Sequence, residues 1–161
     1  MSDLKFAIEM EHDGEKYYRR QAEINENKDV RTVCLMMAED EKRHAQILTD
    51  KMNEKTFQLV DTDTLAKAKN VFAGKADLKV EGKATPSQLD FYRTALDMEK
   101  QSIDLYTGFL SKADGAKEKE LFEYLVQQEK QHFDLIEELV TLLGHAEQWV
   151  EFAEFGVRKE Y

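Results

Sequence analysis

A Glu-x-x-His motif occurs twice in the chain, and its two copies restrict the fold more than any other feature. Glu41-Lys-Arg-His44 returns 88 positions later as Glu129-Lys-Gln-His132. Apolar residues at helical spacing surround both copies, so each Glu and His shares one apolar face of a helix. A carboxylate and an imidazole that are buried without a partner cost several kcal/mol. The motifs therefore indicate a metal ion as the shared partner.

A single glutamate precedes each copy at the same distance. Glu11 lies 30 residues before Glu41, and Glu99 lies 30 residues before Glu129. In an antiparallel hairpin of helices, two positions lie at one level when the turn falls midway between them. The midpoints are Glu26 and Asp114, and both fall in polar breaks of the sequence. Each half of the chain is therefore predicted to bring two carboxylates and one imidazole to one level.

Hydrophobic periodicity predicts an all-α chain with four long helices. The predicted helices cover about residues 3–24, 29–53, 86–112 and 117–143. Asp29 is the expected N-cap of the second helix. The run Thr85-Pro86-Ser87-Gln88 combines an N-cap, a proline at the first helical position and a capping-box partner, which favours a helix start there. Gly144 is expected to end the fourth helix.

The connection between the second and third helices is long, covering residues 54–84. It contains one predicted short helix from Thr62 to Phe72, with Leu65, Ala68 and Phe72 facing inward and Gly74 as its C-cap. A connection of this length can return along a bundle of roughly 38 Å. We therefore expect parallel second and third helices in an up-down-down-up bundle, whether the hairpins pair within one chain or between subunits. The aromatic tail, residues 145–161, is expected to pack on the bundle or on a second subunit.

Composition excludes several classes of protein. A length of 161 residues suits one domain, and the formal net charge of −10 argues against nucleic acid or an anionic membrane as partners while favouring cations. No apolar run approaches the roughly 20 residues that span a bilayer, and the N-terminus lacks signal-peptide features, so we expect a cytoplasmic protein. The single cysteine, Cys34, rules out a Cys-x-x-Cys metal site within this sequence, and we interpret it as a core residue.

Two halves packed face to face would complete a carboxylate-bridged dinuclear site, in which two helices each give one Glu and two each give a Glu-x-x-His. The predicted ligands are Glu11, Glu41, His44, Glu99, Glu129 and His132. Glu41 and Glu129 are placed to bridge two ions. Oxygen and nitrogen ligands without a thiolate favour iron or manganese over structural zinc. Tyr18 and Tyr106, two turns beyond the lone glutamates, are either core aromatics or hydrogen-bond donors to the ligands.

The four motifs together resemble those of the rubrerythrin branch of the ferritin-like superfamily. The resemblance rests on Glu11-x6-Tyr18, Glu41-x-x-His44, Glu99-x6-Tyr106 and Glu129-x-x-His132, and it covers about residues 4–143. It implies a four-helix bundle with one long crossover, a di-iron centre, and reduction of hydrogen peroxide or oxidation of Fe(II) under oxidative stress. Rubrerythrins proper also carry a rubredoxin domain and a further Glu one turn past the third-helix ligand. This sequence has no such cysteines and has Ser102 at that position.

These observations lead to one functional hypothesis and two alternatives. We expect a protein that binds two iron ions, with manganese or zinc as substitutes, and that reacts them with hydrogen peroxide or dioxygen. Its electrons would come from an external donor such as rubredoxin, and we expect a homodimer. One alternative is a non-catalytic protein that binds or stores iron or manganese. The other is a scaffold whose site holds an adventitious ion.

Overall fold

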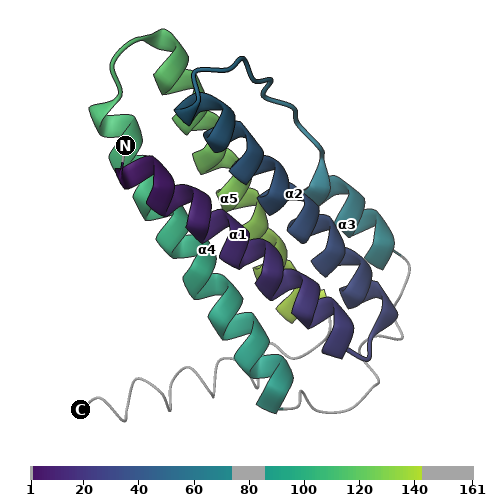
Figure 1. The fold of residues 1–161 in the computed structure, drawn as a ribbon. Coiled ribbons are helices and arrows are strands. Elements are labelled where there is room, and N and C mark those ends of the chain that lie inside the picture. The colour runs from purple at the N-terminus through teal and green to yellow at the C-terminus, as the bar shows by residue number, and fades with distance from the viewer. Residues whose placement is uncertain (1, 74–85, 143–161) are drawn as a thin grey trace, which may run out of the picture.

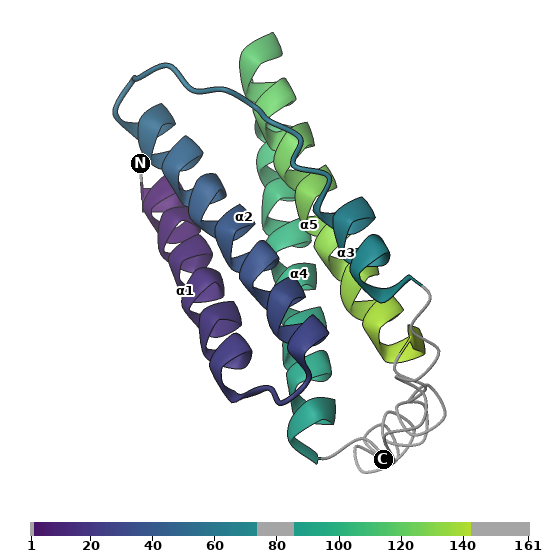
Figure 2. The ribbon, with the colours of Figure 1, turned by 90° about the vertical axis from the view of Figure 1, so that its right-hand side faces the viewer.

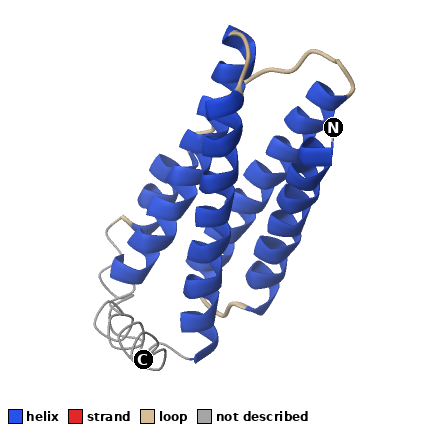
Figure 3. Ribbon diagram, turned by 90° about the vertical axis from the view of Figure 1, so that its left-hand side faces the viewer, coloured by secondary structure: helices blue, strands red, loops and turns tan. Residues whose placement is uncertain are grey.

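The computed structural model describes residues 2–73 and 86–142, and every regular element in these ranges is a helix (Figure 3). The elements are α1 (Ser2–Ile24), α2 (Lys28–Met52), α3 (Thr64–Phe72), α4 (Pro86–Lys112) and α5 (Ala116–Leu142). The bounds of the four long helices differ by no more than one residue from those expected from the periodicity. Within the described ranges, none of the helices combines the length and the apolar character that crossing a membrane requires.

The four long helices form two antiparallel hairpins that pack side by side. α1 packs mainly against α2, and α4 packs mainly against α5. α2 and α4 run in the same direction, which confirms the predicted up-down-down-up bundle (Figure 1). The chain that leaves α2 returns along the outside of the bundle, and α3 packs on α2 and α5 (Figure 2). The crossover therefore lies on the side of the bundle that α2 and α5 form.

Two turns fix the hairpins at the level that the sequence spacing requires. The side chain of Asn27 accepts hydrogen bonds from the backbone N–H groups of Asp29 at 2.9 Å and Val30 at 3.1 Å, so Asn27 is the N-cap of α2. The expectation that Asp29 is the N-cap was wrong, because the helix begins one residue earlier and Asp29 lies in its first turn. Between α4 and α5, Gly115 adopts a φ of +91°, a conformation that favours glycine.

In the part of the chain that the structure describes, the interior contains two apolar clusters separated by a polar layer. One cluster contains Tyr18, Met37 and Leu135, and the other contains Leu48, Tyr106 and Leu125. Cys34 belongs to the first cluster, where burial raises the pKa of its thiol to about 12 and leaves it a small core residue. The polar layer between the clusters contains the buried glutamates and histidines.

The short helix of the crossover begins at Thr64, two residues later than expected, and is preceded by Asp63 in the left-handed conformation. Ala68 and Phe72 are buried, and Leu65 is partly buried against the first apolar cluster. Several sequence expectations fall outside the described residues: the caps at Gly74, Thr85 and Gly144, and the packing of the tail, residues 145–161.

Candidate metal centre

All six candidate ligands lie together in the polar layer at the middle of the bundle. α1 contributes Glu11, α2 contributes Glu41 and His44, α4 contributes Glu99, and α5 contributes Glu129 and His132. None of the six is more than 4% exposed. The equal spacing of 30 residues between the lone Glu and the motif in each half explains this common level, since each turn lies midway between them.

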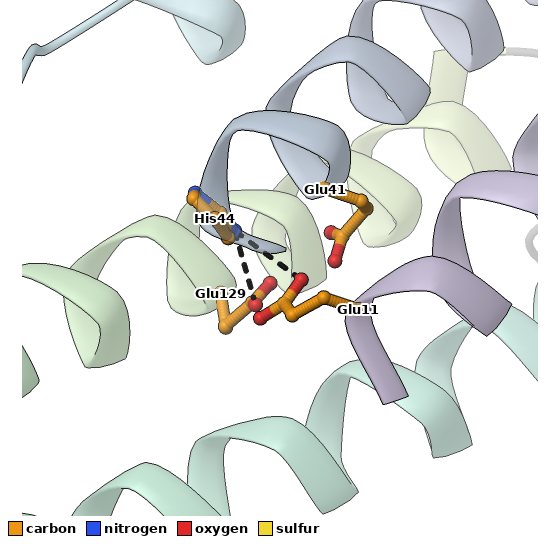
Figure 4. Close-up of side chains that lie close together, drawn as sticks. All are labelled: Glu11, Glu41, His44 and Glu129. Atoms are coloured by element: carbon orange, nitrogen blue, oxygen red, sulfur yellow. Dashed lines mark ion pairs between the residues drawn. The ribbon is translucent and has the colours of Figure 1, made fainter. Parts of the chain in front are cut away.

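The six side chains form two overlapping groups. The first is Glu11, Glu41, His44 and Glu129, and the second is Glu41, Glu99, Glu129 and His132. In each group, one potential ligand atom per residue lies within 4.8 Å of the others. Figure 4 shows the first group, in which the imidazole of His44 pairs with the carboxylates of Glu11 and Glu129 and the carboxylate of Glu41 lies beside that of Glu11. Glu41 and Glu129 belong to both groups, so two cations held by these groups would share these two carboxylates.

The inward-facing atoms of this centre have no hydrogen-bond partners. Among the described residues, seven buried side-chain atoms of the six ligands lack one: Glu11 Oε2, Glu41 Oε1, His44 Nδ1, Glu99 Oε2, both carboxylate oxygens of Glu129, and His132 Nδ1. Leaving one buried polar group unsatisfied costs about 1–3 kcal/mol. A pair of divalent cations would satisfy all seven atoms together, so the residues fit a dinuclear metal site.

The protonation of the metal-free centre reflects the crowding of its carboxylates. Burial and the charge of Glu11 raise the pKa of Glu41 well above its usual value, and the same two causes raise that of Glu129 to about 8. Burial also acts to raise the pKa of Glu11, but the neighbouring Glu41 carboxyl and the charge of His44 lower it to about 2. The site therefore retains protons where cations would otherwise neutralise its carboxylates.

The histidines respond to the same crowding. Burial acts to lower the pKa of both imidazoles, but the facing carboxylates, Glu11 for His44 and Glu99 for His132, raise it well above the usual value. His132 Nδ1 lies 2.7 Å from Glu41 Oε1, and His44 Nδ1 lies 3.3 Å from Glu129 Oε1. Both Nδ1 atoms thus face the carboxylates, where a cation would replace the proton.

Two tyrosines connect the hairpins through Glu11 and Glu99, the terminal glutamates, each of which belongs to only one of the two ligand groups. The hydroxyl of Tyr18 on α1 donates to Glu99 Oε1 on α4, and the hydroxyl of Tyr106 on α4 donates to Glu11 Oε1 on α1. Burial, together with the charge of the carboxylate that each one faces, raises the pKa of both hydroxyls well above 10, so both remain donors. Each terminal glutamate therefore has one oxygen fixed by a tyrosine and Oε2 left toward the centre.

Comparison with known protein families shows which family the chain belongs to. The family model described as Rubrerythrin matches residues 3–140. The chain belongs to the rubrerythrin family. Searches of curated proteins and of solved structures gave no match. The family and the buried carboxylate and histidine cluster are together compatible with a di-iron site.

Two residues that sequence reasoning missed hold the imidazoles on the side away from the carboxylates. Nε2 of His132 donates to Asp40 Oδ2 at 2.9 Å, and Nε2 of His44 donates to Gln128 Oε1 at 3.1 Å. Asp40 directly precedes Glu41, and Gln128 directly precedes Glu129, so each half of the chain supports the histidine of the other half. Hydrogen bonds of this kind orient a ligating imidazole and fix which nitrogen faces the metal.

The two supporting residues differ in charge. Burial acts to raise the pKa of Asp40, but its hydrogen bond to His132 and the charge of that imidazole hold it well below its usual value, so Asp40 is a carboxylate. It also accepts hydrogen bonds from Thr64 at 2.5 Å, Thr62 at 3.0 Å and Arg43 at 3.2 Å. Arg43 donates to Gln128 as well, at 3.1 Å. His132 therefore has an anionic acceptor, braced by the crossover, whereas His44 has a neutral amide.

Proposed function

We propose that the centre binds two Fe(II) ions and that Glu41 and Glu129 contact both. Glu11 with His44 would complete one position, and Glu99 with His132 would complete the other. The proposal rests on the overlap of the two ligand groups at Glu41 and Glu129. Four carboxylates balance the charge of two divalent ions, and the absence of thiolates favours iron or manganese over structural zinc.

The reaction that this centre supports best is the reduction of hydrogen peroxide. Two Fe(II) ions held by these residues would supply the two electrons that, with two protons, convert one peroxide molecule to two water molecules. The protein's own contribution is to hold the ligands in place. The polar layer lies between two apolar clusters, and the hydroxyls of Tyr18 and Tyr106 fix Glu99 and Glu11.

The oxidised centre would need electrons from outside these 161 residues. A rubredoxin-type iron site needs four cysteine ligands, and these 161 residues contain a single cysteine. We therefore propose an external donor, such as rubredoxin, that returns the centre to the ferrous state between reactions. Oxidation of Fe(II) by dioxygen would use the same ligands.

The test is a rapid-mixing experiment on the Fe(II)-loaded protein. We expect one peroxide to be consumed per two Fe(II) in a single burst, with continued turnover only when rubredoxin and its reductase are added. The variant Glu129→Ala removes a shared carboxylate and should lose both the second ion and the burst. Sustained peroxide loss without a reductant would indicate catalase-like chemistry instead. Two tightly bound ions that do not react with peroxide would favour the alternative of an iron-binding or storage protein.

A further inference from the structure

A cavity of about 430 Å³ leads from the surface between α1 and α4 to the candidate metal centre. Its walls include Met10 and Gly14 from α1 and Met98 and Ser102 from α4. It exists because α1 packs mainly on α2 and α4 mainly on α5, so these two helices are not closely packed on one another. The way in which the two hairpins pack together therefore creates the cavity.

The floor of the cavity consists of candidate ligands. Glu41 and Glu99 both line it, although they are only 4% and 2% exposed. Glu41 Oε1 and Glu99 Oε2 are among the buried atoms without a hydrogen-bond partner in the described ranges. A species that enters the cavity would therefore reach the carboxylates of Glu41 and Glu99, whose unpartnered oxygens are buried beneath its floor.

Small residues on both helices keep the inner part of the cavity open. A Cβ added to Gly14 would lie 3.3 Å from Glu41 Oε2, tighter than most such contacts. Glycine inside a helix costs about 1 kcal/mol relative to alanine, so its position next to this carboxylate needs a reason. Across from it, Ser102 Oγ donates to the backbone oxygen of Met98 at 3.1 Å and lies 3.6 Å from Met10 Sδ. The hydroxyl of Ser102 is thus directed to neighbouring protein atoms and carries no charge.

The charge of the lining selects for cations. Glu9 and Asp13 lie one turn apart on α1, are exposed, and belong to the lining, which contains no basic residue from the described part of the chain. Together with the net charge of −10, these carboxylates give the entrance a negative potential. Such a field attracts a hydrated divalent cation, has little effect on uncharged peroxide, and repels anions.

We propose that this cavity is the route by which divalent metal ions enter the centre, with Glu9 and Asp13 attracting the ion and Ser102 leaving space for it. The inference rests on the proposed function, because it needs a metal centre at the floor of the cavity. It adds the path of metal loading and the residues that control its rate.

The experiment measures how fast the metal-free protein takes up Co(II), followed by the visible absorption of the bound ion in a stopped-flow instrument. Ser102→Leu should slow uptake at least tenfold while the final stoichiometry remains two ions. The double variant Glu9→Gln/Asp13→Asn should slow uptake about threefold to tenfold at low ionic strength, and this difference should disappear at high salt, where exposed charges are screened. The control Asp104→Asn/Glu123→Gln removes the same charges from exposed positions outside the lining and should load at the wild-type rate.

Each result decides the inference. Uptake at the wild-type rate in Ser102→Leu with full stoichiometry would overturn the route, as would a double variant that behaves like its control. If Ser102→Leu binds fewer than two ions, the Glu9→Gln/Asp13→Asn variant decides alone, because both residues are exposed and do not belong to the core. A wild-type protein that binds fewer than two Co(II) ions would instead contradict the proposed dinuclear centre, so the two failures are distinguishable.

Discussion

Replacing Asp40 with asparagine tests whether the two metal positions are inequivalent. The change keeps the shape of the side chain but removes the charge that accepts the hydrogen bond from His132 Nε2 at 2.9 Å. An asparagine has one acceptor oxygen, whereas Asp40 uses both of its oxygens to accept from four neighbouring side chains: Arg43, Thr62, Thr64 and His132. Because each oxygen accepts from two of these donors, two donors would then face the amide nitrogen, and His132 would lose its anionic partner.

The expected magnitude follows from the role of Asp40 behind a ligating imidazole. Loss of such a partner lowers metal affinity by about 10-fold to 100-fold, or roughly 1.4–2.7 kcal/mol. The effect should fall on the ion next to His132, because His44 already has the neutral acceptor Gln128. The reverse variant, Gln128→Glu, should tighten binding at the His44 position. Asp104→Asn is the matched control, since it makes the same chemical change at an exposed site.

Calorimetric titration of the metal-free protein with Co(II) gives the two binding constants. Double-mutant cycles assign them: Asp40→Asn should add little in a His132→Ala background and should have its full effect in a His44→Ala background. If Asp40→Asn weakened the binding of both ions equally, or had its full effect in the His132→Ala background, the assignment of Asp40 to one position would be refuted.

Three further predictions concern stability and protonation. Tyr106→Phe should lower the free energy of unfolding by about 1–3 kcal/mol in urea titrations, because Glu11 Oε1 loses its donor; an unchanged midpoint would contradict this. As pH rises from about 5 to 8, the melting temperature of the metal-free protein should decrease. The folded state binds protons at Glu129 and the two histidines more tightly than the unfolded state does, and this stabilisation is lost as pH rises. A melting temperature that increases over this range would contradict the prediction. Calorimetry should show that chelation destabilises the metal-loaded protein by about 2.7 kcal/mol per site, if the free metal concentration before chelation was 100-fold above the dissociation constant of that site.

The level of the six ligands was predictable because local spacing determines it. The distance from Glu11 to Glu41 and the turn after Ile24 are properties of one hairpin, and helical geometry converts them directly into a common height. The apolar stripes then determine which face of each helix is buried. The length of residues 54–84 likewise required a return along the bundle, and hence parallel α2 and α4.

The supporting residues were not predictable in this way, because they depend on how the hairpins pack. Asp40 and Gln128 lie beside the apolar stripes, and each contacts the histidine of the other hairpin. The available signal was the repeat itself, since both residues directly precede the glutamate of the motif. The hydrogen bonds of Thr62 and Thr64 to Asp40 depend on the path of the crossover, which no local pattern specifies. The cavity between α1 and α4 depends in the same way on the pairing of the hairpins.

Anomalous X-ray scattering at the iron edge, from crystals of the protein loaded anaerobically with Fe(II), would test the central claim most directly. The dinuclear site predicts two peaks per chain in the polar layer, one next to His44 and one next to His132, with Glu41 and Glu129 between them and a separation of about 4 Å. A single peak per chain, or iron bound only outside this layer, would contradict it.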